Sequence, residues 1–167
     1  MWKRFDLAEP PASFLPAYDR AVLQLLERPV EPLPGVRSLI SELKRLGVPI
    51  AVASASLRAW VDATLRGLGL QDAFDTTVSA SDVASAKPAP DLYVTAAARL
   101  GVAPEDCLAV EDTLAGVRSA KAAGMFVVQL RAASTALPPL DEADLVLDSA
   151  AAFDFSLLAA AVPERRP

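Results

Sequence analysis

Two adjacent carboxylates, Glu111 and Asp112, follow a short apolar run and stand directly before a helical pattern. In open α/β sheets, ligands bind just outside the carboxyl ends of the strands, which is where this pair would lie. Neighbouring carboxylates repel each other unless a cation lies beside them, and Mg²⁺ prefers oxygen ligands together with waters and a phosphate. The pair therefore predicts a Mg²⁺ site at the end of this strand.

Two further polar side chains, Ser54 and Lys87, fall at a predicted strand end and in a turn after another strand. A serine hydroxyl with free backbone N–H groups and a lysine ammonium can hold phosphate oxygens and neutralise the charge that shifts during phosphoryl transfer. The chain contains no histidine, which is the commonest general base and zinc ligand. Its chemistry must therefore use carboxylates, hydroxyls and ammonium groups.

Each of these residues also has a purely structural interpretation. Ser54 could cap the helix that follows it, and Lys87 could be a solvated turn residue. Glu111 and Asp112 could favour the start of a helix through its dipole, and Asp82 reads as an acid of a turn. Taken one by one, the residues leave both interpretations open.

The elements that must position these side chains follow from hydrophobic periodicity. Helical stripes alternate with short apolar runs that are typical of buried parallel strands. The predicted helices are residues 18–26, 36–46, 57–68, 92–100 and 113–123. The predicted strands are residues 48–53, 74–79, 108–110, 126–130 and 145–147. This alternation predicts an α/β fold with a parallel sheet and helices on both faces.

Composition limits the classes of function. With 167 residues and 53% hydrophobic residues, the chain suits one soluble domain with a sizeable core. A net charge of -5, with no basic cluster beyond Arg165 and Arg166, argues against nucleic-acid and anionic-membrane partners. Cys107 is the single cysteine, and no long apolar segment suggests secretion or a membrane span. We expect a cytoplasmic protein.

Together and in this order, the motifs resemble those of the haloacid dehalogenase superfamily, in particular its phosphatases and phosphoglucomutase-like members with a helical cap. The resemblance rests on PLPGV at 32–36, AVASAS at 51–56, KPAPDLY at 87–93 and VEDTLAGVRSAKAAGM at 110–125. It implies a Rossmann-like core in which Ser54, Ala55 and Lys87 bind a phosphate, with Ser54 and Lys87 taking part in catalysis. It also implies that Asp112, helped by Glu111, holds Mg²⁺.

The first motif of that family is an aspartate nucleophile followed two residues later by an acid/base aspartate, and no such pair is found here. Asp6 is the nearest candidate, but Ala8 replaces the second acid and Pro10 replaces the threonine that should follow. We therefore expect that the first central strand and most of the cap are missing. The expected parts are a remnant of a helical cap and linker at 1–30, the α/β core at 31–162 and a flexible tail at 163–167.

The resemblance implies a Mg²⁺-dependent phosphatase whose ligand is a small phosphorylated metabolite or inorganic phosphate. Without the nucleophilic carboxylate no phosphoaspartyl intermediate forms, so we predict that these 167 residues are inactive as written. Three alternatives remain open: a non-catalytic phosphate-binding or interaction remnant, a sugar-phosphate mutase if completed upstream, and an active enzyme that uses Asp6. Loss of a central strand also predicts self-association through unpaired strand edges.

Overall fold

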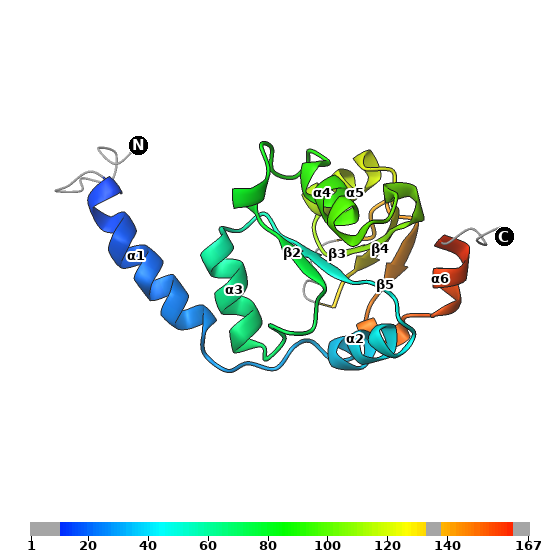
Figure 1. Ribbon diagram of the computed structural model, residues 1–167, viewed down its shortest axis with the longest axis horizontal. Coiled ribbons are helices and arrows are strands. Elements are labelled where there is room, and N and C mark those ends of the chain that lie inside the picture. Colours follow the sequence, from blue (N-terminus) through cyan, green and yellow to red (C-terminus); the bar gives the residue numbers. More distant parts are fainter. Residues whose placement is uncertain (1–10, 133–137, 162–167) are drawn as a thin grey trace.

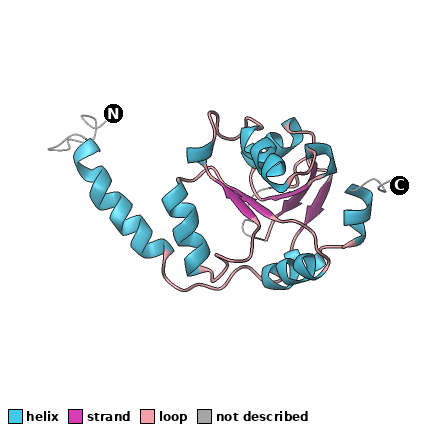
Figure 2. Cartoon of the chain, in the orientation of Figure 1, coloured by secondary structure: helices cyan, strands magenta, loops and turns pink. Residues whose placement is uncertain are grey.

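The computed structural model describes residues 11–132 and 138–161, so Asp6 and the expected tail at 163–167 lie outside the described residues. Its α-helices are α1 (Pro11–Leu26), α2 (Val36–Arg45), α3 (Arg58–Gly67), α4 (Asp91–Leu100), α5 (Leu114–Ala122) and α6 (Ser156–Ala161). Short 3-10 helices are η2 (Ala80–Asp82), η3 (Pro104–Asp106) and η4 (Ala150–Ala152). The strands are β1 (Ala51–Ala53), β2 (Thr76–Val78), β3 (Leu108–Glu111), β4 (Phe126–Leu130) and β5 (Leu145–Leu147) (Figures 1 and 2).

Each helix and strand predicted from periodicity is present, which confirms the α/β class. The bounds of several elements differ from the prediction. The first predicted strand begins only at Ala51, since the Ile50 N–H donates to the Asp75 carboxylate (2.8 Å) and not to a backbone carbonyl of β2. Helix α1 begins at Pro11 rather than near Tyr18, since proline suits the first helical position. Helix α6 was not predicted.

The parallel sheet is divided into two parts. Strand β1 pairs with β2, and β3, β4 and β5 form a second parallel group in that order. Within the described residues, no strand joins β1 to β3. Both groups lie in the middle of the molecule, with helices above and below them (Figure 1).

Helix α4 connects the two parts of the sheet. Its residues Leu92 and Ala96 pack in one core cluster with Val78 of β2. Its residues Tyr93 and Ala97 belong to a second cluster that also contains residues of β3, α5 and β4, among them Ala109, Val117 and Val127. One helix thus holds both parts of the sheet in place.

The opposite face is covered by other helices. Ile40 of α2 forms a cluster with Val61 and Leu65 of α3, and Val52 of β1 packs against it. Helices therefore cover both faces, as predicted. Helix α1 extends from this side of the molecule and packs on α3, where the rings of Tyr18 and Trp60 meet edge to face, 6.1 Å apart (Figure 1).

Backbone hydrogen bonds show which groups of β1 and β3 face the gap between the two parts of the sheet. The Ser54 N–H donates to the Val78 carbonyl (2.9 Å), and the Phe126 N–H donates to the Cys107 carbonyl (3.1 Å). In a parallel strand, alternate residues direct both backbone groups to the same side. The residues that direct their N–H and C=O groups away from β2 and β4 are therefore Ala51, Ala53, Leu108 and Val110.

These open edges predict a pattern of amide hydrogen exchange that alternates along each strand. We expect the amides of Ala53 and Val110 to exchange at least about tenfold faster than those of Val52 and Ala109, their neighbours in the same strands. Hydrogen exchange followed by NMR measures this difference, and the neighbours serve as internal controls. Equal protection of both sets would contradict open edges and indicate that something covers them.

Candidate active site

The carboxyl ends of β1 and β3 meet at a cavity of about 530 Å³. Its lining residues are Leu33, Ala53, Ser54, Ala55, Ser56, Lys87, Val110, Glu111, Asp112, Thr113 and Leu130. The structure thus brings together all the residues that the motifs single out in the core, Ser54, Ala55, Lys87, Glu111 and Asp112. The open edges of β1 and β3 reach the same cavity, and Val110 there is 42% exposed although it lies within a strand.

A buried ion pair joins Lys87 to Glu111. The Lys87 Nζ atom donates to Glu111 Oε1, and the two side chains are 12% and 7% exposed. Nζ also lies 5.1 Å from the centre of the Tyr93 ring, within range of a cation–π contact. The interpretation of Lys87 as a solvated turn residue is therefore wrong, because its ammonium group has turned inward onto a carboxylate.

Tyr93 and Thr113 complete the surroundings of the Glu111 carboxylate. The buried Tyr93 hydroxyl donates to Oε1, and the Thr113 hydroxyl donates to Oε2 over 3.3 Å. Burial raises the pKa of the Tyr93 phenol well above its ordinary value, and the negative charge of Glu111 raises it further. The phenol therefore stays protonated and remains a hydrogen-bond donor to the carboxylate.

Gly116 provides the space in which the Glu111 carboxylate lies. A Cβ atom added at Gly116 would overlap the carboxylate, including its Oε2 atom. The Gly116 N–H donates to the Thr113 hydroxyl (3.0 Å), which makes Thr113 the N-cap of α5. Capping of α5 is thus the task of Thr113, and Glu111 packs closely against the first turn of this helix.

Asp112 differs from Glu111 in being exposed, and no described residue pairs with its side chain. Mg²⁺ is commonly bound through one or two carboxylates, with waters and a substrate phosphate as its other ligands. In the described part of the chain, no group of three acidic, histidine or cysteine side chains comes together as a metal cluster. The residues present fit a Mg²⁺ ion that Asp112 would share with a phosphate and waters. That Glu111 is a metal ligand stays a prediction, and its oxygens have protein partners here.

The loop after β1 carries Ser54 and Ala55. The Ser54 hydroxyl accepts from the Ser56 N–H (3.2 Å), and Ala55 and Ser56 are exposed. Helix α3 has Leu57 as its N-cap, without a side-chain hydrogen bond. The interpretation of Ser54 as a helix cap is therefore wrong. Its hydroxyl shapes a tight turn at the mouth of the cavity instead.

Sequence reasoning missed Tyr93 and Gly116 as parts of this site. Tyr93 lies within the predicted helix 92–100, and a buried tyrosine hydroxyl needs a hydrogen-bond partner, which is the signal that the sequence offers. Gly116 lies in the first turn of α5 with an ordinary helical backbone, so nothing in the sequence marked the close approach of a carboxylate.

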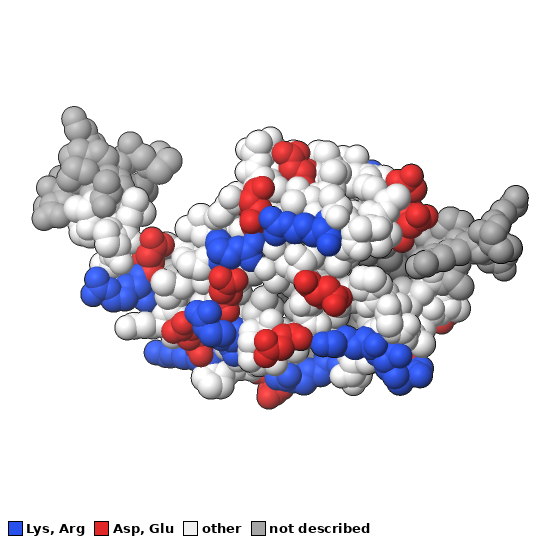
Figure 3. Space-filling view, in the orientation of Figure 1, with Lys and Arg blue, Asp and Glu red and all other residues white. Residues whose placement is uncertain are grey.

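On the face shown in Figure 3, acidic and basic side chains lie side by side. Every helix within residues 11–132 and 138–161 is too short or too polar to cross a membrane.

A parallel α/β fold with polar residues gathered at its strand ends defines the broad class, and comparison with known proteins gives the family. A model of the haloacid dehalogenase-like hydrolases matches residues 3–124. The chain belongs to this family. The solved structure of CbbY from Rhodobacter sphaeroides in complex with phosphate is similar, with a TM-score of 0.78 and 33% identity over 87% of this chain and 67% of that one. This likeness confirms the predicted Rossmann-like core.

Two proteins of Bacillus subtilis (strain 168) are similar in sequence. The chain is 40% identical over 125 residues to the putative phosphatase YhcW, covering 75% of this chain and 57% of that protein. It is 38% identical over 130 residues to beta-phosphoglucomutase, covering 78% of this chain and 55% of that protein. The chain therefore spans somewhat more than half the length of these relatives.

Replacing Tyr93 by Phe tests its hydrogen bond to Glu111. Tyr93→Phe removes one donor from a buried carboxylate, and we expect it to lower the free energy of unfolding by roughly 1.5–3 kcal/mol. Urea denaturation measures the change. Tyr18→Phe, at a tyrosine that is 55% exposed, is the matched control and should have almost no effect. Equal effects of the two substitutions would argue against the bond.

Replacing Gly116 by Ala tests the space that the carboxylate occupies. Alanine favours a helix over glycine by roughly 0.5–1 kcal/mol, so propensity alone would stabilise α5. We expect the opposite sign, a loss of about 1–3 kcal/mol, because the new methyl group would overlap Glu111. Thermal or urea unfolding gives the sign. Ala115→Gly, at the exposed neighbouring position, measures the effect of helix propensity alone. A Gly116→Ala variant that is more stable than the unchanged chain would refute the close approach of the Glu111 carboxylate to Gly116.

Proposed function

We propose that this chain carries the phosphate-binding and Mg²⁺-binding side of a phosphoryl-transfer site for a small phosphorylated metabolite. The observation that carries the proposal is the convergence of Ser54, Ala55, Lys87 and Asp112 on one cavity at the carboxyl ends of β1 and β3. Relatives named as phosphatases support it. They include hexitol phosphatase A and fructose-1-phosphate phosphatase YqaB of Escherichia coli (strain K12), 40% and 42% identical over 70% and 66% of this chain.

In this proposal, the cavity walls supply complementary donors for a phosphate. Lys87 provides a positive charge, and the Ser54 hydroxyl and the Ala55 N–H provide uncharged donors on the β1 side. Within the described residues no acceptor for the Ala55 N–H is present. Donors that are fixed before the ligand arrives bind an anion without a further ordering cost.

Glu111 and Asp112 then have different tasks. Glu111 shares its Oε1 between Lys87 and Tyr93, so it fixes the ammonium group at the cavity wall. Asp112 is exposed and would hold Mg²⁺ together with the phosphate. When bound, the ion would neutralise negative charge on the phosphate oxygens.

In this proposal, no carboxylate of the described residues is left to act as the nucleophile. Glu111 and Asp112 are the acidic side chains that line the cavity, and both have the tasks given above. Asp6 lies outside the described residues, so its candidacy stays a prediction. We therefore propose that these 167 residues bind phosphate but do not turn over a phosphate ester. A phosphatase and a sugar-phosphate mutase would share this half of the site.

The gap between β1 and β3 indicates how the site could be completed. An extended segment inserted parallel to both strands would pair with the open backbone groups of Ala51 and Ala53 on one side and of Leu108 and Val110 on the other. Its carboxyl end would then reach the cavity, where an aspartate could serve as the nucleophile. Self-association of the chain would use the same open edges of β1 and β3.

The cytoplasmic location of the protein stays a prediction.

Calorimetric titration with inorganic phosphate, with and without Mg²⁺, tests the binding function. We expect binding to the unchanged chain, strengthened by Mg²⁺, and binding weaker by about tenfold or more in Lys87→Met, because one charge-assisted hydrogen bond is lost. Lys44→Met is the control, since Lys44 bonds to the Asp72 carbonyl away from this cavity. Ser54→Ala gives a second test that leaves the buried ion pair intact.

Hydrolysis of an aryl phosphate tests the catalytic part. We expect no turnover by these residues alone and turnover by a longer chain that adds an apolar strand ending in aspartate. Absence of phosphate binding to the unchanged chain would refute the proposed function. Turnover by the chain alone that is lost in Asp6→Asn would favour the alternative in which Asp6 is the nucleophile.

A further inference from the structure

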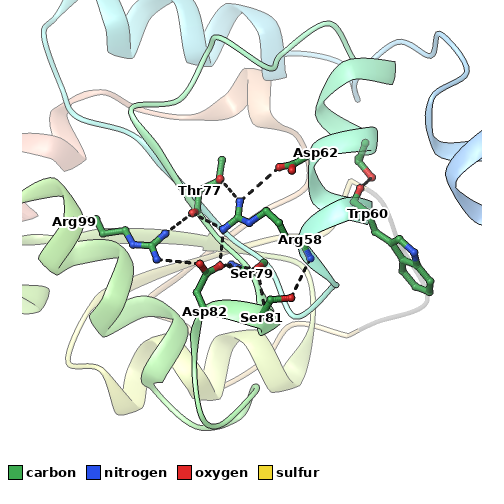
Figure 4. A network of polar contacts seen from close by, with 9 residues as sticks. Arg58, Trp60, Asp62, Thr77, Ser79, Ser81, Asp82 and Arg99 are labelled. Carbon is green, nitrogen blue, oxygen red and sulfur yellow. Dashed lines mark hydrogen bonds and ion pairs between the residues drawn. The ribbon is translucent and has the colours of Figure 1, made fainter. Parts of the chain in front are cut away.

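The turn behind the loop that carries Ser54, residues 79–82, is held by a group of charged side chains centred on Asp82 (Figure 4). The Asp82 carboxylate accepts from the Ser79 N–H (2.8 Å) and the Ser79 hydroxyl (2.6 Å). It also accepts from Arg58 and, over 3.0 Å, from Arg99. Ser79 is fully buried, and the Asp82 side chain is 21% exposed. Four donors thus converge on one carboxylate.

The two arginines extend this group to other elements. Arg58, at the start of α3, also donates to the Thr77 carbonyl (2.9 Å) and to the Thr77 hydroxyl. Arg99, near the end of α4, donates to the same carbonyl over 2.7 Å. The Asp82 group therefore fixes the end of β2 and the turn after it to the helices α3 and α4 (Figure 4).

The same turn makes direct contacts with the loop at 54–57. The Ala80 N–H donates to the Ser56 carbonyl (3.0 Å), and the Arg58 N–H donates to the Ser81 hydroxyl (3.3 Å). With the bond from the Ser54 N–H to the Val78 carbonyl (2.9 Å), the beginning and the middle of the loop and the residue that follows it are all bonded to residues 78–81. The position of the loop thus depends on a segment that Asp82 holds in place.

Asp82 remains charged under ordinary conditions. Hydrogen bonds from Ser79, with further ones from Arg99 and Arg58, hold the pKa of Asp82 well below its usual range. Asp82, Arg58 and Arg99 are not among the residues that line the cavity, so their effect on a ligand there would be indirect. A single exposed ion pair contributes little to stability, but shared partners in a network can fix a geometry.

We propose that Asp82, held between Arg58 and Arg99, is a positioning residue for the phosphate-binding loop at 54–57. This inference rests on the proposed function, because it assigns the loop a phosphate to bind. Asp82 acts through the turn at 79–82, which presents the Ser54 hydroxyl and the Ala55 N–H at the cavity. Loss of its charge releases the turn, and the loop then samples positions in which these donors no longer converge.

The test compares two isosteric substitutions that each remove a carboxylate partner of Arg58. Asp82→Asn removes the group that holds the turn. Asp62→Asn is the matched control, because Asp62 lies 3.6 Å from Arg58 but makes no described contact with the turn. We expect Asp82→Asn to weaken inorganic phosphate binding by about tenfold, similar to the cost of losing supporting hydrogen bonds at metal sites. Asp62→Asn should bind within about twofold of the unchanged chain.

The amide NMR signals of Ser54, Ala55 and Ser56 provide a readout that a general loss of stability would not move. We expect these signals to shift or broaden in Asp82→Asn at a temperature where the variant is fully folded. Unchanged loop signals and unchanged phosphate affinity would overturn the inference, even if the variant unfolds at a lower temperature. If the unchanged chain fails to bind phosphate, the proposed function fails, whereas the loop signals still report on positioning.

Should Asp82→Asn not fold, Arg99→Gln replaces it as the test. This change leaves the bonds between Ser79 and Asp82 in place and removes the bonds that Arg99 donates to Asp82 and to the Thr77 carbonyl. We expect a smaller loss of phosphate affinity, about threefold, together with shifted loop signals. Wild-type affinity with wild-type loop signals in Arg99→Gln would contradict the inference.

Discussion

The ion pair between Lys87 and Glu111 is the contact on which the site depends. It joins a turn that precedes α4 to the end of β3, and both side chains are almost fully buried. Removing two charges from water is costly, so such a pair is kept only where further hydrogen bonds satisfy it. Tyr93 and Thr113 donate to the carboxylate, and Gly116 leaves room for it. Three elements, α4, β3 and α5, are thereby fixed around one carboxylate.

The second constraint is the division of the sheet. Helix α4 holds both parts, with Leu92 and Ala96 on the β1–β2 part and Tyr93 and Ala97 on the other. The parts therefore keep their relative positions although β1 and β3 are not paired with each other. The cavity lies where their open edges end, so the backbone groups that lack a strand partner and the polar side chains of the site belong to the same region.

The fold was largely predictable because it follows from local patterns. Short apolar runs between helical stripes gave every predicted strand, and the alternation gave the parallel arrangement with helices on both faces. Strand bounds were less predictable. Strand β1 begins later than predicted because the Ile50 N–H bonds to the Asp75 side chain, and β2 is limited to Thr76–Val78, since pairing with a partner decides where a ladder ends.

The sequence by itself determined that Ser54, Glu111 and Asp112 lie near one another, because residues at the carboxyl ends of parallel strands meet at one edge of a sheet. It could not decide what each side chain does there. Only the tertiary structure turned Glu111 inward onto Lys87 and Tyr93 while leaving Asp112 exposed, and only it placed the Asp82 group behind the Ser54 loop. Adjacent carboxylates look alike in a sequence. The partners that distinguish them come from α4 and α5, which lie near β3 only in the folded chain.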